Sequence, residues 1–260
     1  MTTPNESMRV ALISGGASGI GLATAEILAA RHHHVYLADI NMDLAKQQAA
    51  RLCDEGFKAS AVALDLTQEA NWQTAMADVE AQHGRLDVLV NNAGIGVGGT
   101  IESTSLADFQ LSMSVNVNGV FLGCKYGIPL MEKNGGGAVI NISSIFGIVS
   151  DQLVVAYSAS KGAVRSMTKS IALDCAARKN GVRVNSVHPG FVETPMVAGA
   201  AEQLPEDILT DYMQRTVGLT PMGRFGQPNE IGEVIAFLAS PQSSFMTGAE
   251  LVVDGGFTAR

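Results

Sequence analysis

Residues 14–21 read SGGASGIG, and the glycines at positions 15, 19 and 21 follow the pattern G-x-x-x-G-x-G. Residues 9–14 (RVALIS), which lead into this stretch, form an apolar run typical of a buried strand. Residues 20–31, which follow it, are rich in alanine and predict a helix. A strand, a glycine turn and a helix in this order predict a phosphate cradle, because glycines let backbone N–H groups approach a pyrophosphate at the helix N-terminus.

A second glycine-rich stretch competes for the same role. Residues 94–99 (GIGVGG) match the standard dinucleotide fingerprint G-x-G-x-x-G more closely than residues 14–21 do. That fingerprint also requires a helix directly after the turn and an acidic residue about 20 positions further on, at the end of the next strand. Asp39 ends the predicted strand 34–39 and lies 20 residues after Gly19, whereas residues 100–104 separate the second stretch from any helix. The sequence therefore favours residues 14–21 as the cradle and a flexible turn in the second stretch.

Asp39 also indicates which dinucleotide binds. A carboxylate at this position accepts hydrogen bonds from a ribose 2′-hydroxyl and repels a 2′-phosphate. Neither residues 39–43 nor the glycine turn contains an Arg or Lys that would neutralise such a phosphate. NAD is therefore the expected cofactor, in preference to NADP, and an ordinary turn acid is the alternative interpretation of Asp39.

Apolar strands alternate with helical patterns along the whole chain. The predicted strands are residues 9–14, 34–39, 58–64, 86–91, 138–143, 182–187 and 251–254, and the predicted helices are residues 20–31, 42–55, 68–82, 106–131, 155–178 and 230–239. Continuous hydrophobic strands separated by helices indicate parallel strands that are covered on both faces. The expected fold class is α/β, as a single-domain, doubly wound, Rossmann-type parallel sheet of about seven strands over residues 1–260.

Residues 194–224 interrupt this alternation. They contain three prolines, scattered acids and only short helical patterns, and an insertion of this kind is usually functional or disordered. We expect a lid over the substrate, with Met196, Met213 and Met222 available to line an adaptable apolar pocket.

Composition and charge exclude several classes of function. The chain has 260 residues, a formal net charge of −8 and no run of Lys or Arg, so nucleic acid and anionic membranes are not expected as partners. No apolar segment approaches the roughly 18 residues of a membrane helix, and the N-terminus does not predict export. Three scattered cysteines favour a reduced, cytoplasmic setting. Residues 32–34 (HHH) predict a solvated helix end, and no metal site is expected.

Further motifs resemble those of the short-chain dehydrogenase/reductase superfamily, in its common form of about this length. The glycine turn is that family's variant, and the resemblance covers essentially the whole chain. The other matching motifs, in order, are residues 91–94 (NNAG), Asn116 in SVNVNGVF, Ser143 and Ser144 in INISS, residues 157–161 (YSASK), and Pro189 and Gly190 followed by Thr194. The resemblance implies an NAD-dependent oxidoreductase that interconverts a secondary alcohol and a ketone by hydride transfer.

The resemblance assigns the catalytic roles. Tyr157 would be the general acid or base, Lys161 would tune it and bind the nicotinamide ribose, Ser144 would polarise the substrate oxygen, and Asn116 would orient a water in a proton relay. Free tyrosine has a pKa of about 10, so a base at neutral pH needs a nearby cation, and Lys161 lies four residues later on the same helix face. Ser144 is chosen over Ser143 because the family uses the second serine, and adjacent strand residues face opposite ways.

The resemblance also implies the cofactor contacts. They are Gly15, Ser18, Gly19, Ile20, Gly21, Asp39, Ile40, Asp65, Leu66, Asn92, Ala93, Gly94, Tyr157, Lys161, Pro189, Gly190, Val192 and Thr194. Helix capping is the alternative interpretation of Asp65. His188, next to the cofactor loop, is expected to be structural in preference to contacting substrate.

Two other functions compete with this interpretation. A 3-ketoacyl-carrier-protein-type reductase would meet an acidic partner with a like net charge, and Asp39 opposes the phosphorylated cofactor of such enzymes. A non-catalytic NAD-binding sensor would have no reason to retain Ser144, Tyr157 and Lys161 at working spacing. The moderately apolar lid suits a hydrophobic alcohol, a cyclic diol or a hydroxysteroid without choosing among them. The resemblance further implies a homotetramer.

Overall fold

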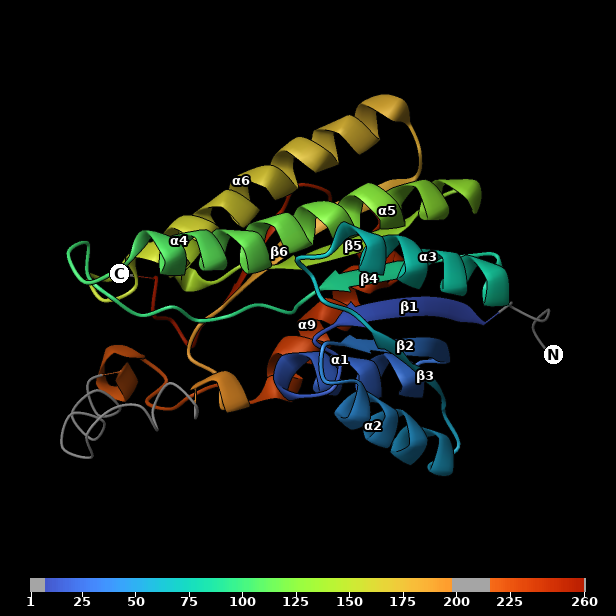
Figure 1. Cartoon of the computed structure of the whole chain (residues 1–260), viewed down its shortest axis with the longest axis horizontal. Helices are drawn as coiled ribbons and strands as arrows, with labels where there is room; N and C mark the ends of the chain where they lie inside the picture. Colours follow the sequence, from blue (N-terminus) through green and yellow to red (C-terminus); the bar gives the residue numbers. More distant parts are fainter. Residues whose placement is uncertain (1–7, 198–215, 260) are drawn as a thin grey trace.

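A seven-stranded parallel sheet lies between two layers of helices in the computed structural model, which describes residues 8–197 and 216–259 (Figure 1). The strands are β1 (Arg9–Ser14), β2 (His33–Asp39), β3 (Lys58–Ala63), β4 (Val88–Asn91), β5 (Gly137–Ile142), β6 (Val182–Pro189) and β7 (Glu250–Val253). Their order across the sheet is β3-β2-β1-β4-β5-β6-β7, so the direction of winding reverses between β1 and β4. This arrangement confirms the predicted doubly wound, Rossmann-type fold.

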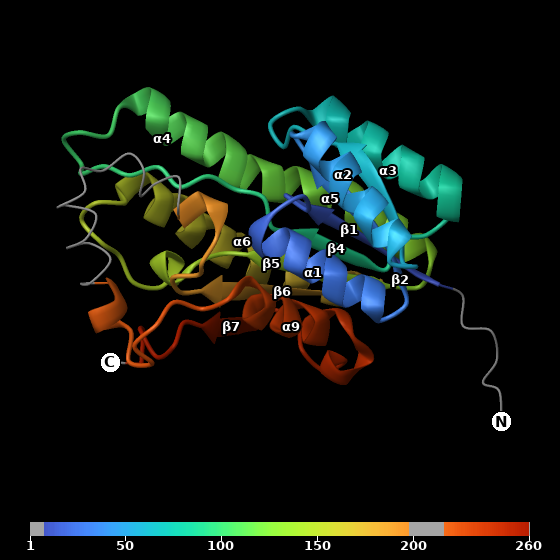
Figure 2. The same cartoon turned by 90° about the horizontal axis from the view of Figure 1, so that it is seen from below.

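Helices cover both faces of the sheet, as the continuous apolar strands predict. Figures 1 and 2 show α1 (Gly19–Ala30), α2 (Met42–Asp54) and α9 (Pro228–Ala239) on one face, and α3 (Glu69–His83), α4 (Leu106–Met113), α5 (Gly119–Lys133) and α6 (Val155–Arg178) on the other. Successive side chains of β1 point to opposite faces of the sheet. Leu12 packs in the core under α3 and α5, and Ile13 packs in the core under α1 and α9. None of the helices in the described ranges is long and apolar enough to cross a membrane.

The single helix predicted at residues 106–131 is wrong in one respect. A π-helical segment, η1 (Ser114–Asn118), separates α4 from α5 and contains Asn116. The side chain of Asn116 donates to the Ile95 carbonyl oxygen at 2.9 Å and to Ser160 Oγ at 3.0 Å, and its Oδ1 accepts from the Ile95 N–H at 2.8 Å. These bonds anchor the wider turn, and π-bulges of this kind often occur at functional positions.

The solvated helix end predicted at residues 32–34 is also wrong for His33. This side chain is 6% exposed, and its Nδ1 lies 3.1 Å from the carbonyl oxygen of Leu28 near the end of α1. A carbonyl oxygen accepts and does not donate, so the His33 ring donates to carbonyl oxygens at the end of α1. His34 points elsewhere, with its Nε2 at 2.9 Å from Ser60 Oγ.

The predicted lid falls largely on residues that the structure does not describe. Of residues 194–224, only 194–197 and 216–224 are described, and Met213 lies outside them. Met196 and Met222 are 45% and 63% exposed. The lid, and with it the division of the chain into one domain with an insertion, stays a prediction.

The glycine turn between β1 and α1 closes too tightly for any side chain at Gly21. A Cβ on Gly21 would lie 2.0 Å from the Gly15 carbonyl oxygen and 2.7 Å from Asn92 Nδ2. Gly15 itself has a φ of +64°, a backbone conformation that disfavours other residues. The start of α1 is therefore fixed against the ends of β1 and β4.

Gly21→Ala is expected to destabilise the protein by at least about 2 kcal/mol. The added methyl group overlaps the Gly15 carbonyl group, which cannot move without distorting the whole glycine turn. Gly162→Ala in α6 is the matched control, since a Cβ there meets nothing within 4 Å. That control should gain up to about 1 kcal/mol from reduced backbone entropy in the unfolded chain. Urea denaturation of both variants measures the difference, and equal free energies of unfolding would contradict the steric argument.

Candidate active site

The N-terminus of α1 is open to an anion. Helix α1 begins at Gly19, the Ser18 side chain makes no capping hydrogen bond among the described residues, and the first turn contains no acidic residue. The leading N–H groups of a helix need partners, and the helix dipole favours negative charge there. The turn lies at the point where the strand order reverses, at the carboxyl edge of the sheet. Its shape fits the pyrophosphate of a dinucleotide.

Asn92 and Ala93 follow β4 and are tied to this turn. The Oγ of Ser14 accepts from the N–H groups of Asn92 and Ala93, at 3.0 and 3.1 Å. The side-chain amide of Asn92 donates to the Ser14 carbonyl oxygen at 3.0 Å and to the Gly15 carbonyl oxygen at 3.3 Å. Asn92 therefore holds the glycine turn in shape, a task that the resemblance did not indicate.

Asp39 lies beside the turn, as the predicted spacing requires. Its Oδ2 accepts from the Ala17 N–H at 3.2 Å, and its Oδ1 accepts from the Asn41 N–H at 2.9 Å. Ile40 next to it is 75% exposed. A carboxylate held in this way carries a fixed negative charge at the end of β2, on the side of the turn away from β4.

Asp65 and Leu66 occupy the end of the neighbouring strand. The Oδ1 of Asp65 accepts from the N–H and the hydroxyl of Thr67, at 2.9 and 2.7 Å, so this carboxylate organises its own turn and does not cap α3. Leu66 is buried and lies against Gly119, where a Cβ would come within 2.9 Å of it.

The loop after β6 returns to the glycine turn. Gly190 donates its N–H to the Val253 carbonyl oxygen at 2.9 Å, and the buried Val192 pairs with Gly226. The Thr194 methyl group then lies 3.4 Å from the position that a Cβ on Gly19 would take. The structure thus brings the predicted loop from Pro189 to Thr194 against the cradle.

The second glycine-rich stretch does not form a cradle. The N–H of Gly99 donates to the Leu153 carbonyl oxygen at 2.6 Å, and Gly99 pairs with Val154 as an isolated bridge. No helix follows it until α4 begins at Leu106. A helix therefore begins directly after the first glycine stretch and not after the second.

Ser144 is the serine that is available to a ligand. Its Oγ accepts from the Phe146 N–H at 3.1 Å, which leaves the hydroxyl hydrogen free to donate elsewhere. Ser143, in contrast, donates its hydroxyl to the Lys161 carbonyl oxygen at 2.9 Å and so faces α6. Tyr157 shares a hydrogen bond with the Ser144 side chain, which brings the two hydroxyl groups together.

Lys161 is buried beside Tyr157, with 4% of its surface exposed. Its Nζ donates to the Ile142 carbonyl oxygen at 2.9 Å and lies 5.6 Å from the centroid of the Tyr157 ring. Burial lowers the pKa of Lys161 to about 8. A Cβ on Gly94 would lie 3.4 Å from this Nζ and 2.9 Å from the Oδ1 of Asn116, so the backbone at Gly94 packs closely against both polar groups.

The pKa of Tyr157 departs from the expectation drawn from the sequence. Burial raises this pKa, and the hydrogen bond with Ser144 opposes the rise. The cation effect expected of Lys161 is not among the causes of the shift. A protonated tyrosine is the state that a general acid needs for ketone reduction, whereas alcohol oxidation requires the opposite direction of shift.

Asn116 uses its side chain to hold two segments together. The amide donors reach the Ile95 carbonyl oxygen and Ser160 Oγ, and one lone pair of Oδ1 accepts from Ile95. A water relay through this side chain therefore has only the second lone pair of Oδ1 available.

An aromatic group that the sequence analysis missed lies next to the catalytic residues. The ring of Phe146 is 6.4 Å from that of Tyr157 and 5.8 Å from that of Phe191, which in turn packs on Phe225 at 6.0 Å and Phe257 at 5.7 Å. We call these four phenylalanines the aromatic wall. They come from four separate segments and share no spacing that could have revealed them, and they supply an apolar surface beside the Tyr157 ring.

Comparisons with known proteins agree with this geometry. A family model described as "Enoyl-(Acyl carrier protein) reductase" matches residues 15–258. An NADP-dependent (R)-specific alcohol dehydrogenase of Lentilactobacillus kefiri is 42% identical over 97% of each chain. A cyclopentanol dehydrogenase of Comamonas sp. is 41% identical over 96% of this chain and 97% of its own length. A 3-alpha-(or 20-beta)-hydroxysteroid dehydrogenase of Mycobacterium bovis is 43% identical over 96% of this chain and 90% of its own length.

Solved structures show the same fold. Levodione reductase superposes with a TM-score of 0.92 at 32% identity, over 96% of this chain and 98% of that one. A gluconate 5-dehydrogenase of Burkholderia cenocepacia, in complex with NADP and tartrate, superposes with a TM-score of 0.88 at 35% identity, over 97% and 96%.

Lys161→Met is expected to stabilise the folded protein at pH 7. The folded pKa of about 8 lies below the value of about 10.4 for an unfolded lysine, so burying the charge costs about 3 kcal/mol below pH 8. The lost bond to the Ile142 carbonyl offsets part of that gain, by about 1–3 kcal/mol. Between pH 8 and 10.4 the unfolded wild-type chain binds the extra proton, so wild-type stability rises and the advantage of the variant shrinks, by about 2 kcal/mol from pH 7 to pH 9.5.

Urea denaturation at both pH values measures this change. Lys133→Met removes an exposed lysine and serves as the control, whose difference from wild type should not depend on pH. An advantage of Lys161→Met that stays constant from pH 7 to pH 9.5 would show that the burial of this charge carries no such cost.

Proposed function

Because the chain belongs to the short-chain dehydrogenase/reductase superfamily, we propose that it is an NAD-dependent dehydrogenase that interconverts a hydrophobic secondary alcohol and its ketone. The observation that carries the proposal is the meeting of three groups. The Ser144 hydroxyl, the Tyr157 hydroxyl and the Lys161 ammonium converge at the carboxyl edge of the sheet, next to a cradle that fits a dinucleotide.

Each of these groups has one task in the reaction. The cradle at residues 14–21 would hold a nicotinamide dinucleotide, which would supply the hydride-transfer chemistry. Tyr157 gives its proton to the oxygen of the ketone during reduction and takes it back during oxidation. Ser144 donates its hydroxyl hydrogen to the same oxygen, because its own oxygen is occupied by the Phe146 N–H. Lys161 stabilises the tyrosinate that forms, and Asn116 keeps the loop after β4 next to it.

The proposed preference for NAD is supported by Asp39. Its carboxylate is fixed by two backbone N–H groups and lies beside the turn, where a 2′-phosphate would meet a like charge at close range. The relative from Lentilactobacillus kefiri is named as NADP-dependent, and a gluconate 5-dehydrogenase binds NADP. The proposal therefore rests on this chain's own acid and on the lack of Arg and Lys in residues 14–21 and 39–43.

The proposed substrate is a cyclic or otherwise apolar secondary alcohol. The aromatic wall supports this choice, because it presents phenylalanine rings beside the Tyr157 ring. The names of two relatives, a cyclopentanol dehydrogenase and a hydroxysteroid dehydrogenase, indicate substrates of this kind. The description of the family model favours a carrier-protein substrate as the second candidate. The net charge of −8 opposes this candidate, because acyl carrier proteins are acidic and would be repelled.

We also propose a cytoplasmic homotetramer. Large apolar side chains on its surface, with Leu173 at 72% exposed and Phe245 fully exposed, support an association between copies. Three free cysteines, two of them buried, fit a reducing compartment.

Tyr157→Phe is expected to lower turnover by about 10²- to 10⁴-fold, because the variant keeps the ring and loses the transferable proton. NADH binding, measured by fluorescence titration, should stay within about twofold. Tyr126→Phe removes a hydroxyl that bonds Gln73 on the outer surface and should leave turnover unchanged. Near-normal turnover in Tyr157→Phe would overturn the role of this residue. A wild-type protein that oxidises none of a diverse panel of secondary alcohols, and reduces none of the matching ketones, would overturn the proposed function.

Asp39→Ala is expected to lower the ratio of kcat/KM for NAD to that for NADP by at least about tenfold, since a repulsion of about 1.4 kcal/mol or more is removed. Asp43→Ala, which removes an exposed acid in the first turn of α2, is the control and should leave the ratio nearly unchanged. Steady-state kinetics with NAD and with NADP measure this ratio for the wild type and both variants. An unchanged ratio in Asp39→Ala would mean that another group selects the cofactor.

A further inference from the structure

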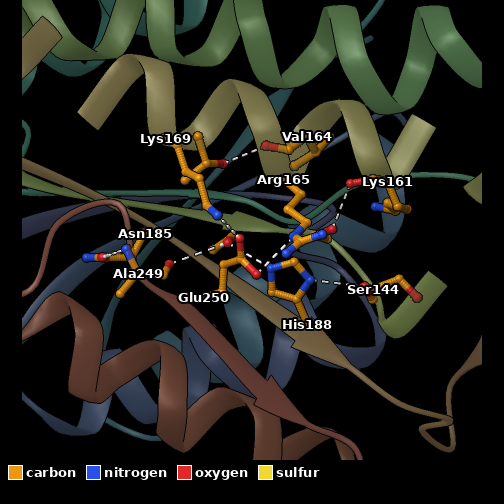
Figure 3. A network of polar contacts seen from close by, with 12 residues as sticks. Ser144, Lys161, Val164, Arg165, Lys169, Asn185, His188, Ala249 and Glu250 are labelled. Carbon is orange, nitrogen blue, oxygen red and sulfur yellow. Dashed lines mark hydrogen bonds and ion pairs between the residues drawn. The ribbon is translucent and has the colours of Figure 1, made fainter. Parts of the chain in front are cut away.

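His188 is a fully buried histidine that the proposed chemistry does not use. It belongs to β6, and its exposed fraction is 0%. Its Nδ1 lies 3.0 Å from the main-chain carbonyl oxygen of Ser144 (Figure 3). Its Nε2 lies 2.8 Å from Ser186 Oγ. Burial excludes contact between this ring and a substrate.

The two partners fix the tautomer of the ring. The carbonyl oxygen of Ser144 only accepts, so Nδ1 carries the hydrogen. In the neutral ring Nε2 then accepts, and the Ser186 hydroxyl donates to it. The tautomer with hydrogen on Nε2 would place two lone pairs against each other at Ser144.

The surroundings keep the ring neutral. Burial is the largest influence and lowers the pKa of His188. The charges of Arg165 and Lys161 act in the same direction. The Ser144 carbonyl and the Glu250 carboxylate act against it, but Glu250 is itself paired with the guanidinium of Arg165 at 2.9 Å (Figure 3).

The side chain of His188 adds a contact beyond the point where β5 and β6 stop pairing. Strands β5 and β6 pair up to Ile142 and Val187, and the Ser143 N–H still donates to the Val187 carbonyl oxygen at 2.8 Å. The residue after His188 is Pro189, which has no N–H, so the ladder ends there. The imidazole Nδ1–H of His188 then joins β6 to the carbonyl oxygen of Ser144, one residue past the last backbone bond.

The bond from His188 acts on Ser144, whose hydroxyl must point at the substrate oxygen in the proposed reaction. Ser144 leaves the sheet in an extended conformation, and its carbonyl oxygen also accepts from the Gly147 N–H at 2.9 Å. Its hydroxyl oxygen accepts from Phe146 in the same turn. Rotation of the peptide after Ser144 would break the Gly147 and Phe146 bonds together, and the direction of the hydroxyl would be lost.

We infer that His188 is a positioning residue for Ser144, holding its carbonyl through the Nδ1–H and so fixing the direction in which the serine hydroxyl donates. The inference rests on the proposed function for its catalytic meaning. A displacement of about 1 Å of a reacting group is enough to cost about 10²-fold in rate.

Two nearly isosteric variants separate the hydrogen bond from the loss of the ring. His188→Asn keeps an N–H close to the position of Nδ1, and His188→Leu has a similar size without a donor. His188→Leu should lower kcat by about 10- to 100-fold, with the Kd for NADH within about twofold of wild type. His188→Asn should retain kcat within about fivefold. Melting temperatures measured beside the rates show whether the two variants are equally stable.

Crystal structures of the two variants provide a readout that does not need activity. In His188→Leu the Ser144 carbonyl should rotate and the bond from Phe146 N–H to Ser144 Oγ should open, whereas His188→Asn should keep both. If His188→Leu does not fold, His188→Met takes its place, because it also lacks a donor and should lower kcat more than His188→Asn does.

Three outcomes would overturn the inference: unchanged kcat in His188→Leu, equal losses of kcat in the Asn and Leu variants, or an unmoved Ser144 in the His188→Leu structure. A wild-type protein without turnover of any alcohol or ketone would instead overturn the proposed function. In that case the two structures still decide whether His188 positions Ser144.

Discussion

The contact between Gly21 and the carbonyl oxygen of Gly15 is the constraint on which the rest of the site depends. Only a hydrogen fits between them, since a Cβ would lie 2.0 Å from that oxygen. The same lack of a side chain lets the Asn92 amide reach the Ser14 carbonyl, and Asn92 brings the loop after β4 to the turn. That loop continues to Gly94, beside Lys161. The absence of a side chain at Gly21 thus lets the glycine turn and the loop after β4 lie close together.

Burial of Lys161 gives the site its chemistry at a cost in stability. The ammonium has one described protein acceptor, the Ile142 carbonyl, and burial lowers its pKa to about 8. Burial raises the pKa of Tyr157, and the charge of Lys161, whose Nζ lies 5.6 Å from the centroid of that ring, is not among the causes of the shift. Under the proposed function, ketone reduction would start from the protonated tyrosine that burial favours.

The features that the sequence predicted are those with a local or evenly spaced signal. Strand and helix periodicity revealed the seven-stranded sheet, and the spacing from Gly19 to Asp39 identified the cradle. The π-helical segment at Asn116 escaped prediction because its partners, Ile95 and Ser160, are 21 and 44 residues away. The aromatic wall escaped for the same reason, since its rings are 32 to 111 residues apart in the sequence and meet only in the folded chain. The resemblance named Ser144 but could not show that His188, 44 residues later, holds it.

Selection of the cofactor and the chemistry of the substrate occupy different strands of the sheet. Asp39 ends β2 on one side of the switch point between β1 and β4. On the other side, Ser144 follows β5 and Tyr157 belongs to α6. No described hydrogen bond or ion pair joins Asp39 to the catalytic group, because its carboxylate is bound only to Ala17 and Asn41. Under the proposed function, replacing Asp39 is therefore expected to alter the preference between NAD and NADP without breaking a described bond of Ser144 or Tyr157. A relative named as NADP-dependent at 42% identity does not conflict with that proposal, because the proposed preference rests on a separate residue.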